Sequence, residues 1–271
     1  MDLHPTTVLC DADGNLFPSE EPAFVASADV TNAFLAHYGV DRRFTAEELR
    51  LATTGKNFRT TAVDLAVAHG VPVDEAVATG HRGARVRHAA AGEADVLTAA
   101  ELDRWVGEER RQVTAHLGSV LVPDADVIEP VTRLAQRYRL AAVSSSATPR
   151  LAACFIATGL DGLIPPEVRY SAEDSLPVPT SKPDPAVYLF ACEQLGISPD
   201  EAVAVEDSLP GAQSAVAAGI PTVGNLQFVL EDERAERRER LEALGVVAVI
   251  SSWGELEGLL SPVPDLAVSP A

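Results

Sequence analysis

The 271-residue sequence contains few cysteines, few aromatic residues and few lysines. Cys10, Cys154 and Cys192 are odd in number and far apart, which argues against a disulfide framework or a zinc site and favours small buried side chains. No apolar run approaches the length of a membrane span. The segment before Val8 has neither the basic nor the apolar region of a secretion signal. We therefore expect a reduced, cytoplasmic protein that does not bind membranes.

Positive charge is scarce, because 21 Lys and Arg face 40 Asp and Glu, for a formal net charge of −19 at pH 7. Such a chain lacks the basic faces that bind phosphate backbones, so we expect no nucleic-acid partner. Only two of the basic residues are lysines, Lys56 and Lys182. Where arginine serves everywhere else, a retained lysine can mark a position that needs a compact ammonium group. The hydrophobic content of 46% is enough for a sizeable core.

Two carboxylates follow the first apolar run of the chain. The run Val8-Leu9-Cys10 ends at Asp11 and Asp13, and Gly14-Asn15 then turns the chain. Unpaired carboxylates are costly at the end of a buried strand, whereas a hard cation such as Mg²⁺ between them offsets that cost. The ends of parallel strands are also where ligands bind in open sheets. The alternative is an ordinary surface turn rich in Asp and Gly.

Strands and helices alternate along the second part of the chain. Short apolar runs typical of strands occupy Val8–Cys10, Leu140–Val143, Val168–Tyr170, Ala202–Val205, Pro221–Val223 and Val246–Ile250. Helical periodicity occupies Val127–Arg137, Pro149–Thr158, a segment ending at Leu195, Pro210–Ala218, Glu231–Leu244 and Trp253–Leu260. This alternation predicts an α/β fold with a doubly wound parallel sheet.

A long helical segment interrupts this pattern directly after the first strand. From about Glu21 to Leu117 we find helical periodicity and no convincing strand, with helices expected over Asp74–Ala91 and Ala99–Leu117 among others. An all-helical insertion of this length predicts a second, smaller domain. The expected organisation is a sheet core (1–17 and 119–262), a helical domain (18–118) and a flexible, proline-containing tail (263–271).

Further polar groups stand at or just after the predicted strands. Ser144 could be a helix N-cap, Lys182 a surface charge, and Glu206-Asp207 a capping pair for the helix that follows. Together with Asp11 and Asp13, however, they form one coherent set at the same edge of the sheet.

These residues resemble the motifs of the haloacid dehalogenase superfamily of aspartate-nucleophile phosphotransferases. The segment D-A-D-G-N-L resembles its first motif, the apolar run into Ser144 its second, and Lys182 in S-K-P-D-P its third. The stretch Glu206–Gly219 is similar to the fourth motif over its whole length. The resemblance implies a Rossmann-like core, and the helical insertion resembles the cap domain placed between the first and second motifs.

The resemblance also implies roles. Asp11 attacks phosphorus and forms an aspartyl-phosphate, and Asp13 protonates the leaving oxygen and then activates water. The carboxylates of Asp11 and Asp207 and the backbone carbonyl of Asp13 hold Mg²⁺, with Glu206 assisting directly or through water. A phosphoester has negatively charged oxygens, so the metal and a fixed cation must offset charge in the transition state.

The remaining implied roles concern the phosphoryl group and the leaving group. Ser144 donates to a phosphoryl oxygen, Ser145 contacts substrate, and Lys182 neutralises charge and holds the nucleophile. Lys56 and Arg59, in a segment that resembles the substrate-contacting loop of such caps, are candidates to bind the leaving group, although Arg59 could simply be exposed.

Three features depart from the usual pattern of the family. Asn15 stands where Thr is usual, and Pro18 replaces an acid common in the segment that leads to the cap. The loop Glu173–Ser181 is also longer and richer in proline than usual.

Asp13 favours phosphoester chemistry, because dehalogenases and phosphonate-cleaving members lack an acid at this position. We therefore expect a Mg²⁺-dependent phosphatase of a small phosphorylated metabolite, as a monomer or homodimer. A phosphomutase similar to beta-phosphoglucomutase is the first alternative. A non-catalytic binding protein of the same fold is the second, disfavoured by the complete motif set.

Overall fold

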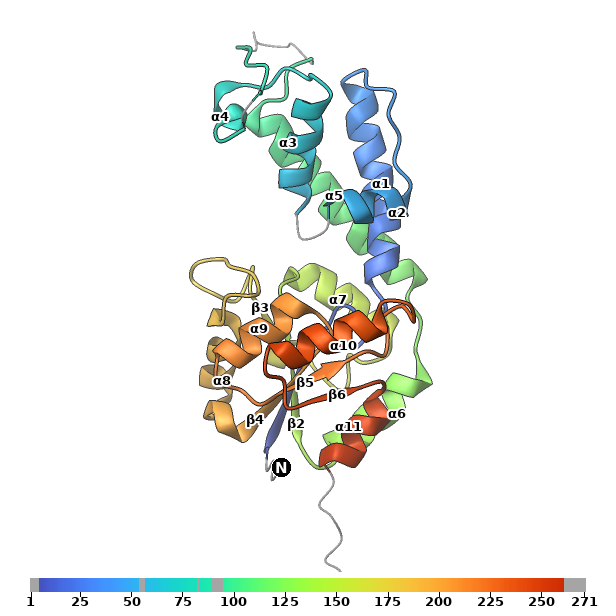
Figure 1. Cartoon of the computed structure of the whole chain (residues 1–271), viewed down its shortest axis with the longest axis vertical. Coiled ribbons are helices and arrows are strands. Elements are labelled where there is room, and N and C mark those ends of the chain that lie inside the picture. The colour runs from blue at the N-terminus through green and yellow to red at the C-terminus, as the bar shows by residue number, and fades with distance from the viewer. Residues whose placement is uncertain (1–4, 54–56, 82, 89–94, 261–271) are drawn as a thin grey trace, which may run out of the picture. The chain divides into compact units, whose positions relative to one another are not determined.

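The computed structural model describes residues 5–53, 57–81, 83–88 and 95–260. The chain divides into two compact units. The sheet unit comprises the residues up to Pro18 and those from Leu121 onward, and the helical unit comprises Ser19–Val120 (Figure 1). The expected flexible tail lies outside the described residues. Among the described helices, none is both long enough and apolar enough to cross a membrane.

A parallel sheet organises the sheet unit (Figure 1). Its strands are β1 Thr7–Cys10, β2 Arg139–Ser144, β3 Arg169–Ser171, β4 Ala202–Glu206, β5 Thr222–Asn225 and β6 Ala248–Ile250. Their order in space is β3-β2-β1-β4-β5-β6, so the chain moves outward from β1 in one direction and then in the other. In this register Cys10 pairs with Ala142 and with Val205. The predicted doubly wound parallel sheet is confirmed, with every predicted strand present.

Helices flank this sheet and connect its strands. They are α6 Ala125–Ala135, α7 Thr148–Ala157, α8 Ala186–Leu195, α9 Leu209–Ala217, α10 Arg234–Ala243 and α11 Trp253–Leu260. The start of α9 is well determined by its sequence, because Ser208 accepts a hydrogen bond from the Gly211 amide and Pro210 occupies the first turn. On α6, Val127, Val131 and Leu134 are buried at helical spacing.

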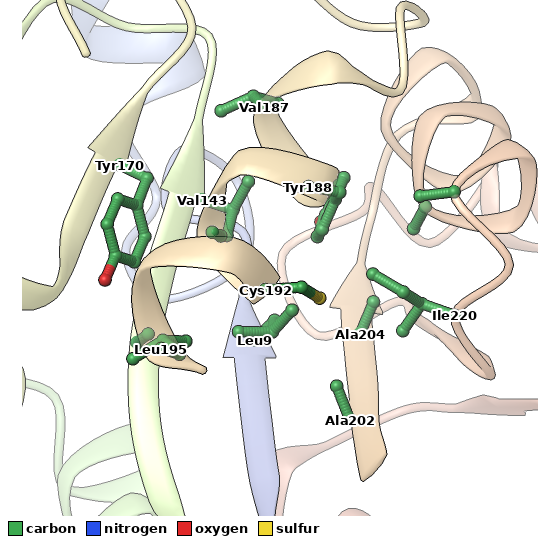
Figure 2. Packing of buried hydrophobic residues seen from close by; sticks show 14 of the residues in the cluster. Leu9, Val143, Tyr170, Val187, Tyr188, Cys192, Leu195, Ala202, Ala204 and Ile220 are labelled. Atoms are coloured by element: carbon green, nitrogen blue, oxygen red, sulfur yellow. The ribbon is translucent and has the colours of Figure 1, made fainter. Parts of the chain in front are cut away.

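One hydrophobic cluster of the sheet unit lies between α8 and the strands (Figure 2). Leu9 and Val143 come from the strands, Ala204 contributes a small side chain from β4, and Tyr188 and Cys192 come from α8. All five are essentially fully buried. Small residues on the sheet let the helix approach closely, and this approach brings the polar tip of Tyr188 to the carboxyl ends of the strands.

The helical unit consists of α1 Glu20–His37, α2 Ala46–Thr53, α3 Phe58–Ala68, α4 Glu75–Ala78 and α5 Ala99–Val120. Its own core gathers apolar residues of α1, α3 and α5. Phe34 and Trp105 meet there edge to face, with ring centroids 5.6 Å apart.

One predicted helix of this unit, Asp74–Ala91, is wrong. Of the described residues in this segment, only the four of α4 are helical, with Asp74 accepting from the Val77 amide as N-cap. Gly80 then adopts a φ of +84°, and Val86 returns to form an isolated parallel bridge with Val73. The sequence holds a sign of this break, because Ala84 and Val86 alternate with arginines, a spacing typical of extended chain and not of a helix.

Asn15, an unusual residue in the first motif, is fully buried and ties together several segments of the sheet unit. Its Nδ2 donates to the carbonyls of Asp11 and Val205, both at 3.0 Å. Its Oδ1 accepts from Asn225 Nδ2 at 2.8 Å, and its backbone carbonyl accepts from Trp253 Nε1 at 2.9 Å. The amide therefore supplies two donors to the ends of β1 and β4 and fixes the turn after Asp11.

We expect Asn15→Ala to lower the free energy of unfolding by about 2–4 kcal/mol, because it removes the donor to the buried Asp11 carbonyl, one of two donors to the Val205 carbonyl and the acceptor of the Asn225 amide. Urea unfolding measures this change. Gln136→Ala, at an exposed position, is the control and should change stability by less than about 0.5 kcal/mol. Equal stability of the two variants would show that the Asn15 hydrogen bonds contribute nothing net.

Candidate active site

The polar residues predicted from the sequence converge at the carboxyl edge of the central strands. Asp11 follows β1 directly, Ser144 ends β2, and Glu206 ends β4 with Asp207 next to it. The order of the strands reverses at β1, and in open parallel sheets such a reversal is where a ligand site forms.

Lys182 connects three of these strand ends. Its Nζ donates to Asp11 Oδ1, to the Val143 carbonyl at 2.8 Å and to Glu206 Oε1 at 2.6 Å. An ammonium group has three hydrogens, so these bonds use its full donor capacity. The side chain is only 5% exposed. A buried ammonium thus holds one oxygen of Asp11 and one of Glu206 at a fixed separation.

Burial and charge act against each other in this cluster. Burial raises the pKa of Asp11, and the Lys182 ammonium opposes that effect. Burial likewise raises the pKa of Glu206 to about 7 against the opposing influence of Lys182. For Lys182 itself, burial lowers the pKa, but the carboxylates of Asp11 and Glu206 outweigh it and raise the pKa above its usual range. The ammonium therefore stays charged, because two adjacent carboxylates favour its protonated form more than burial disfavours it.

Tyr188 also belongs to this hydrogen-bond network. Its hydroxyl donates to Glu206 Oε1 at 2.5 Å, and its ring lies 5.2 Å from Lys182 Nζ. Burial and the adjacent Glu206 carboxylate raise the pKa of Tyr188 well above its ordinary value. The phenol therefore remains a hydrogen-bond donor and fixes the orientation of Glu206.

Three buried carboxylates form a group that is compatible with a metal ion. One oxygen each of Asp11, Glu206 and Asp207 lies within 4.8 Å of the others. Glu206 Oε2 is buried and has no hydrogen-bond partner among the described residues. An all-oxygen donor set of this kind suits a hard divalent cation. The residues present therefore fit the metal that the acidic motif predicts.

Two glycines make room for these carboxylates. A Cβ on Gly211 would overlap Glu206 Oε2, and a Cβ on Gly14 would lie 2.5 Å from Asp207 Oδ2. Gly14 also has a φ of +76°, which side chains disfavour. Arg237 donates to the backbone carbonyl of Asp207 at 2.8 Å and so helps to fix the backbone at Asp207.

Asp13 has a separate set of partners. Arg150, in the first turn of α7, donates to Asp13 Oδ1 at 2.9 Å, and Ser146 Oγ donates to Asp13 Oδ2 at 2.7 Å. Ser144 Oγ lies farther away, 3.5 Å from Oδ2. Both oxygens of Asp13 are therefore engaged by donors that follow β2.

Most of the predicted site residues lie together in the sheet unit. Asp11, Asp13, Ser144, Lys182, Glu206 and Asp207 share the edge described above, and Ser145 joins them because its Oγ accepts from the Lys182 amide at 3.1 Å. Arg59 belongs to the helical unit, where its guanidinium, in a side chain 47% exposed, pairs with Asp103. Lys56 lies outside the described residues. The roles of Arg59 and Lys56 stay predictions.

Ser146, Arg150 and Tyr188 were missed as site residues. Tyr188 could have been found, because it belongs to the buried stripe of α8 and a phenol in such a stripe needs a hydrogen-bond partner. Ser146 belongs to a visible serine run. Nothing local marks Arg150, whose contact with Asp13 spans 137 positions of the chain.

Comparison with known proteins agrees with this geometry. Residues 5–219 match the family model described as haloacid dehalogenase-like hydrolase. Hexitol phosphatase A of Escherichia coli is 32% identical over 154 residues, which cover 56% of this chain and 67% of that protein. The matches to the first three curated relatives span only 19%, 36% and 32% of their lengths.

Solved structures extend the similarity over nearly the whole chain. A hydrolase of the same family from Deinococcus radiodurans, solved with bound phosphate and sodium, is 25% identical with a TM-score of 0.59, covering 97% of this chain and 100% of that one. A haloacid dehalogenase-like protein from Agrobacterium tumefaciens is 22% identical with a TM-score of 0.63, covering 94% of this chain and 97% of that one. The family model matches well over half of the residues, and the chain therefore belongs to the haloacid dehalogenase-like hydrolases.

Proposed function

We propose that the protein is a Mg²⁺-dependent phosphatase that hydrolyses a small phosphorylated metabolite, such as a sugar phosphate, through an aspartyl-phosphate intermediate. One observation carries the proposal. The Lys182 ammonium holds Asp11 and Glu206 together at the edge where the acidic group Asp11, Glu206 and Asp207 collects. A fixed carboxylate next to a buried cation and a metal-type donor set is what attack on a phosphoester requires.

In the first step an oxygen of Asp11 attacks phosphorus, and the bond between phosphorus and the ester oxygen breaks. Lys182 keeps the Asp11 carboxylate in one orientation, which lowers the entropic cost of the attack. Asp13 gives its proton to the departing ester oxygen, which leaves as an alcohol.

In the second step Asp13 accepts a proton from water, and the resulting hydroxide attacks phosphorus. The bond between phosphorus and Asp11 breaks, inorganic phosphate leaves, and both side chains return to their starting state. Asp11, Asp207 and the backbone carbonyl of Asp13 would hold Mg²⁺, with Glu206 assisting. When bound, the metal supplies positive charge opposite the phosphoryl oxygens.

The substrate class follows from the relatives and from Asp13. Hexitol phosphatase A acts, by its name, on a phosphorylated sugar alcohol, whose alkoxide leaves poorly without a proton. An acid next to the nucleophile suits such an ester. In this proposal the helical unit acts as the cap, and Lys56 and Arg59 contact the sugar.

The first test is phosphate release from a panel of sugar phosphates, sugar-alcohol phosphates, phosphoglycolate and nucleotides, with Mg²⁺ and with EDTA. We expect release from sugar or sugar-alcohol phosphates that EDTA abolishes and added Mg²⁺ restores. Isomerisation of a sugar phosphate without release would favour a phosphomutase. Release that is indifferent to EDTA would contradict the assignment of the acidic group as the metal site.

Asp11→Asn should lower kcat by at least about 10³-fold, because an amide is a far weaker nucleophile, while the protein still folds. Steady-state phosphate release measures the loss, and thermal unfolding checks the fold. Asp161→Asn is the matched control, because Asp161 pairs with Arg169 away from the site and should leave kcat within about twofold. Substantial residual turnover in Asp11→Asn would remove Asp11 as the nucleophile.

Gly211→Ala should reduce activity by about 10²-fold or more, because the new Cβ would overlap Glu206 Oε2 and displace the carboxylate from Lys182 and Tyr188. Gly107→Ala is the matched control: it also lies within a helix, and nothing lies within 4 Å of its added Cβ. Alanine is the better helix former, so the control should be neutral or slightly stabilising, by up to about 1 kcal/mol. Phosphate release and thermal unfolding of both variants are the measurements. Equal activity of Gly211→Ala and Gly107→Ala would show that the site does not require close packing between residue 211 and Glu206.

A further inference from the structure

We infer that Arg150 is a positioning residue for proton transfer: it holds the Asp13 carboxylate in the orientation from which Asp13 serves the leaving group. This inference rests on the proposed phosphatase function and assigns a role to a residue that the four sequence motifs do not contain. It concerns the second carboxylate of the site and is independent of the Lys182 network around the first.

Two donors fix the two oxygens of Asp13 separately. Arg150 binds Oδ1 at 2.9 Å and Ser146 binds Oδ2 at 2.7 Å. A carboxylate oxygen has two lone pairs, so an oxygen that accepts a hydrogen bond can still exchange a proton with a ligand. Both torsions of a short Asp side chain are thereby restricted without blocking its chemistry.

Arg150 lies on helix α7, whose position is fixed by packing. It lies in the first turn of α7, a helix that buries Leu151, Cys154 and Phe155 in the sheet unit. The Arg150 amide donates to the Ala147 carbonyl at 3.0 Å. The helix therefore cannot shift readily to follow a displaced Asp13, and the ion pair determines where the carboxylate lies.

The exposure of the pair places it at the solvent side of the site. The Arg150 side chain is 26% exposed and the Asp13 side chain 19%, whereas Lys182 and Asp11 are nearly inaccessible. A leaving group that departs toward solvent can therefore reach Asp13. A charge-assisted hydrogen bond at this depth is worth more than one on the open surface.

Arg150 acts through Asp13, because a guanidinium does not give up its proton in proteins and cannot protonate an alkoxide. Its removal should therefore matter most where the leaving group needs a proton. An alkyl phosphate has such a leaving group, whereas p-nitrophenyl phosphate releases a stabilised anion that leaves without one.

The experiment compares single-turnover release of the leaving group from sorbitol 6-phosphate and from p-nitrophenyl phosphate, with Mg²⁺ present and enzyme in excess. We expect Arg150→Ala to slow sorbitol release by about 10- to 100-fold and nitrophenol release by less than about threefold. Arg150→Lys should recover part of the loss, because it keeps a cation near Asp13. Arg133→Ala, which removes an exposed ion pair with Glu257, is the control and should match the wild type.

A double-mutant cycle separates positioning from a direct contact with substrate. In an Asp13→Ala background the further change Arg150→Ala should slow sorbitol release by less than about threefold, because the group that it positions is gone. The same 10- to 100-fold loss in both backgrounds would mean that Arg150 binds the phosphoryl group itself, and would overturn the inference. Equal losses on both substrates would overturn it as well.

Failure of the proposed function gives a different result. Wild-type enzyme that releases no leaving group from p-nitrophenyl phosphate or from any alkyl phosphate of the panel above would overturn the phosphatase proposal, and this inference with it, before any Arg150 variant is measured; if another alkyl phosphate of the panel is hydrolysed faster, it replaces sorbitol 6-phosphate. A wild type active on both esters, with Arg150→Ala and Arg150→Gln equally active and stable, would overturn this inference alone.

Discussion

The buried ammonium of Lys182 is the interaction on which the rest of the sheet unit's polar edge depends. It meets Asp11, Glu206 and the Val143 carbonyl, so one side chain joins the ends of β1, β4 and β2. Without it, the two negatively charged carboxylates of Asp11 and Glu206 would be buried side by side and would repel each other. Burial already raises the pKa of both. Hydrogen bonds from all three ammonium hydrogens offset the free-energy cost of removing Lys182 from water. Arginine could not replace Lys182 here, because three acceptors converge on a single nitrogen atom and a planar guanidinium spreads its donors over three nitrogens.

Close packing around the carboxylates explains why small residues and amides occur where they do. Gly211 and Gly14 lie against Glu206 and Asp207 so closely that any side chain would overlap an oxygen. Asn15 lies in the turn that follows Asp11 and Asp13 and donates to the carbonyls of Asp11 and Val205, and Trp253 from the last helix binds its backbone. Residues far apart in the sequence therefore share the task of holding one turn. The unusual Asn15 is a structural adaptation of that turn, because it satisfies three partners with one amide side chain.

Much of this arrangement could be predicted from the sequence because it is local. Apolar runs such as Leu140–Val143 mark strands, and polar residues at their ends mark the site. The prediction failed over Asp74–Ala91, where the chain turns at Gly80 and Ala84 and Val86 then alternate with arginines. It also missed Arg150, because a contact across 137 positions leaves no local pattern. Patterns in the chain identify elements and the residues at their ends; which distant side chain reaches them depends on the packing of a helix such as α7, and only the fold reveals it.

The two aspartates of the first motif have different environments although they are two residues apart. Asp11 is buried against an ammonium that itself contacts another carboxylate, whereas Asp13 lies partly exposed against a guanidinium and a hydroxyl. Differences of this kind let neighbouring carboxylates take different parts in one reaction. In the proposed mechanism the first must remain an unprotonated nucleophile and the second must exchange a proton twice in each turnover. The buried Lys182 ammonium, held by three hydrogen bonds, keeps Asp11 charged and oriented for attack. A cation at the solvent side, which orients the carboxylate through a hydrogen bond to one of its oxygens, suits the proton exchange of Asp13.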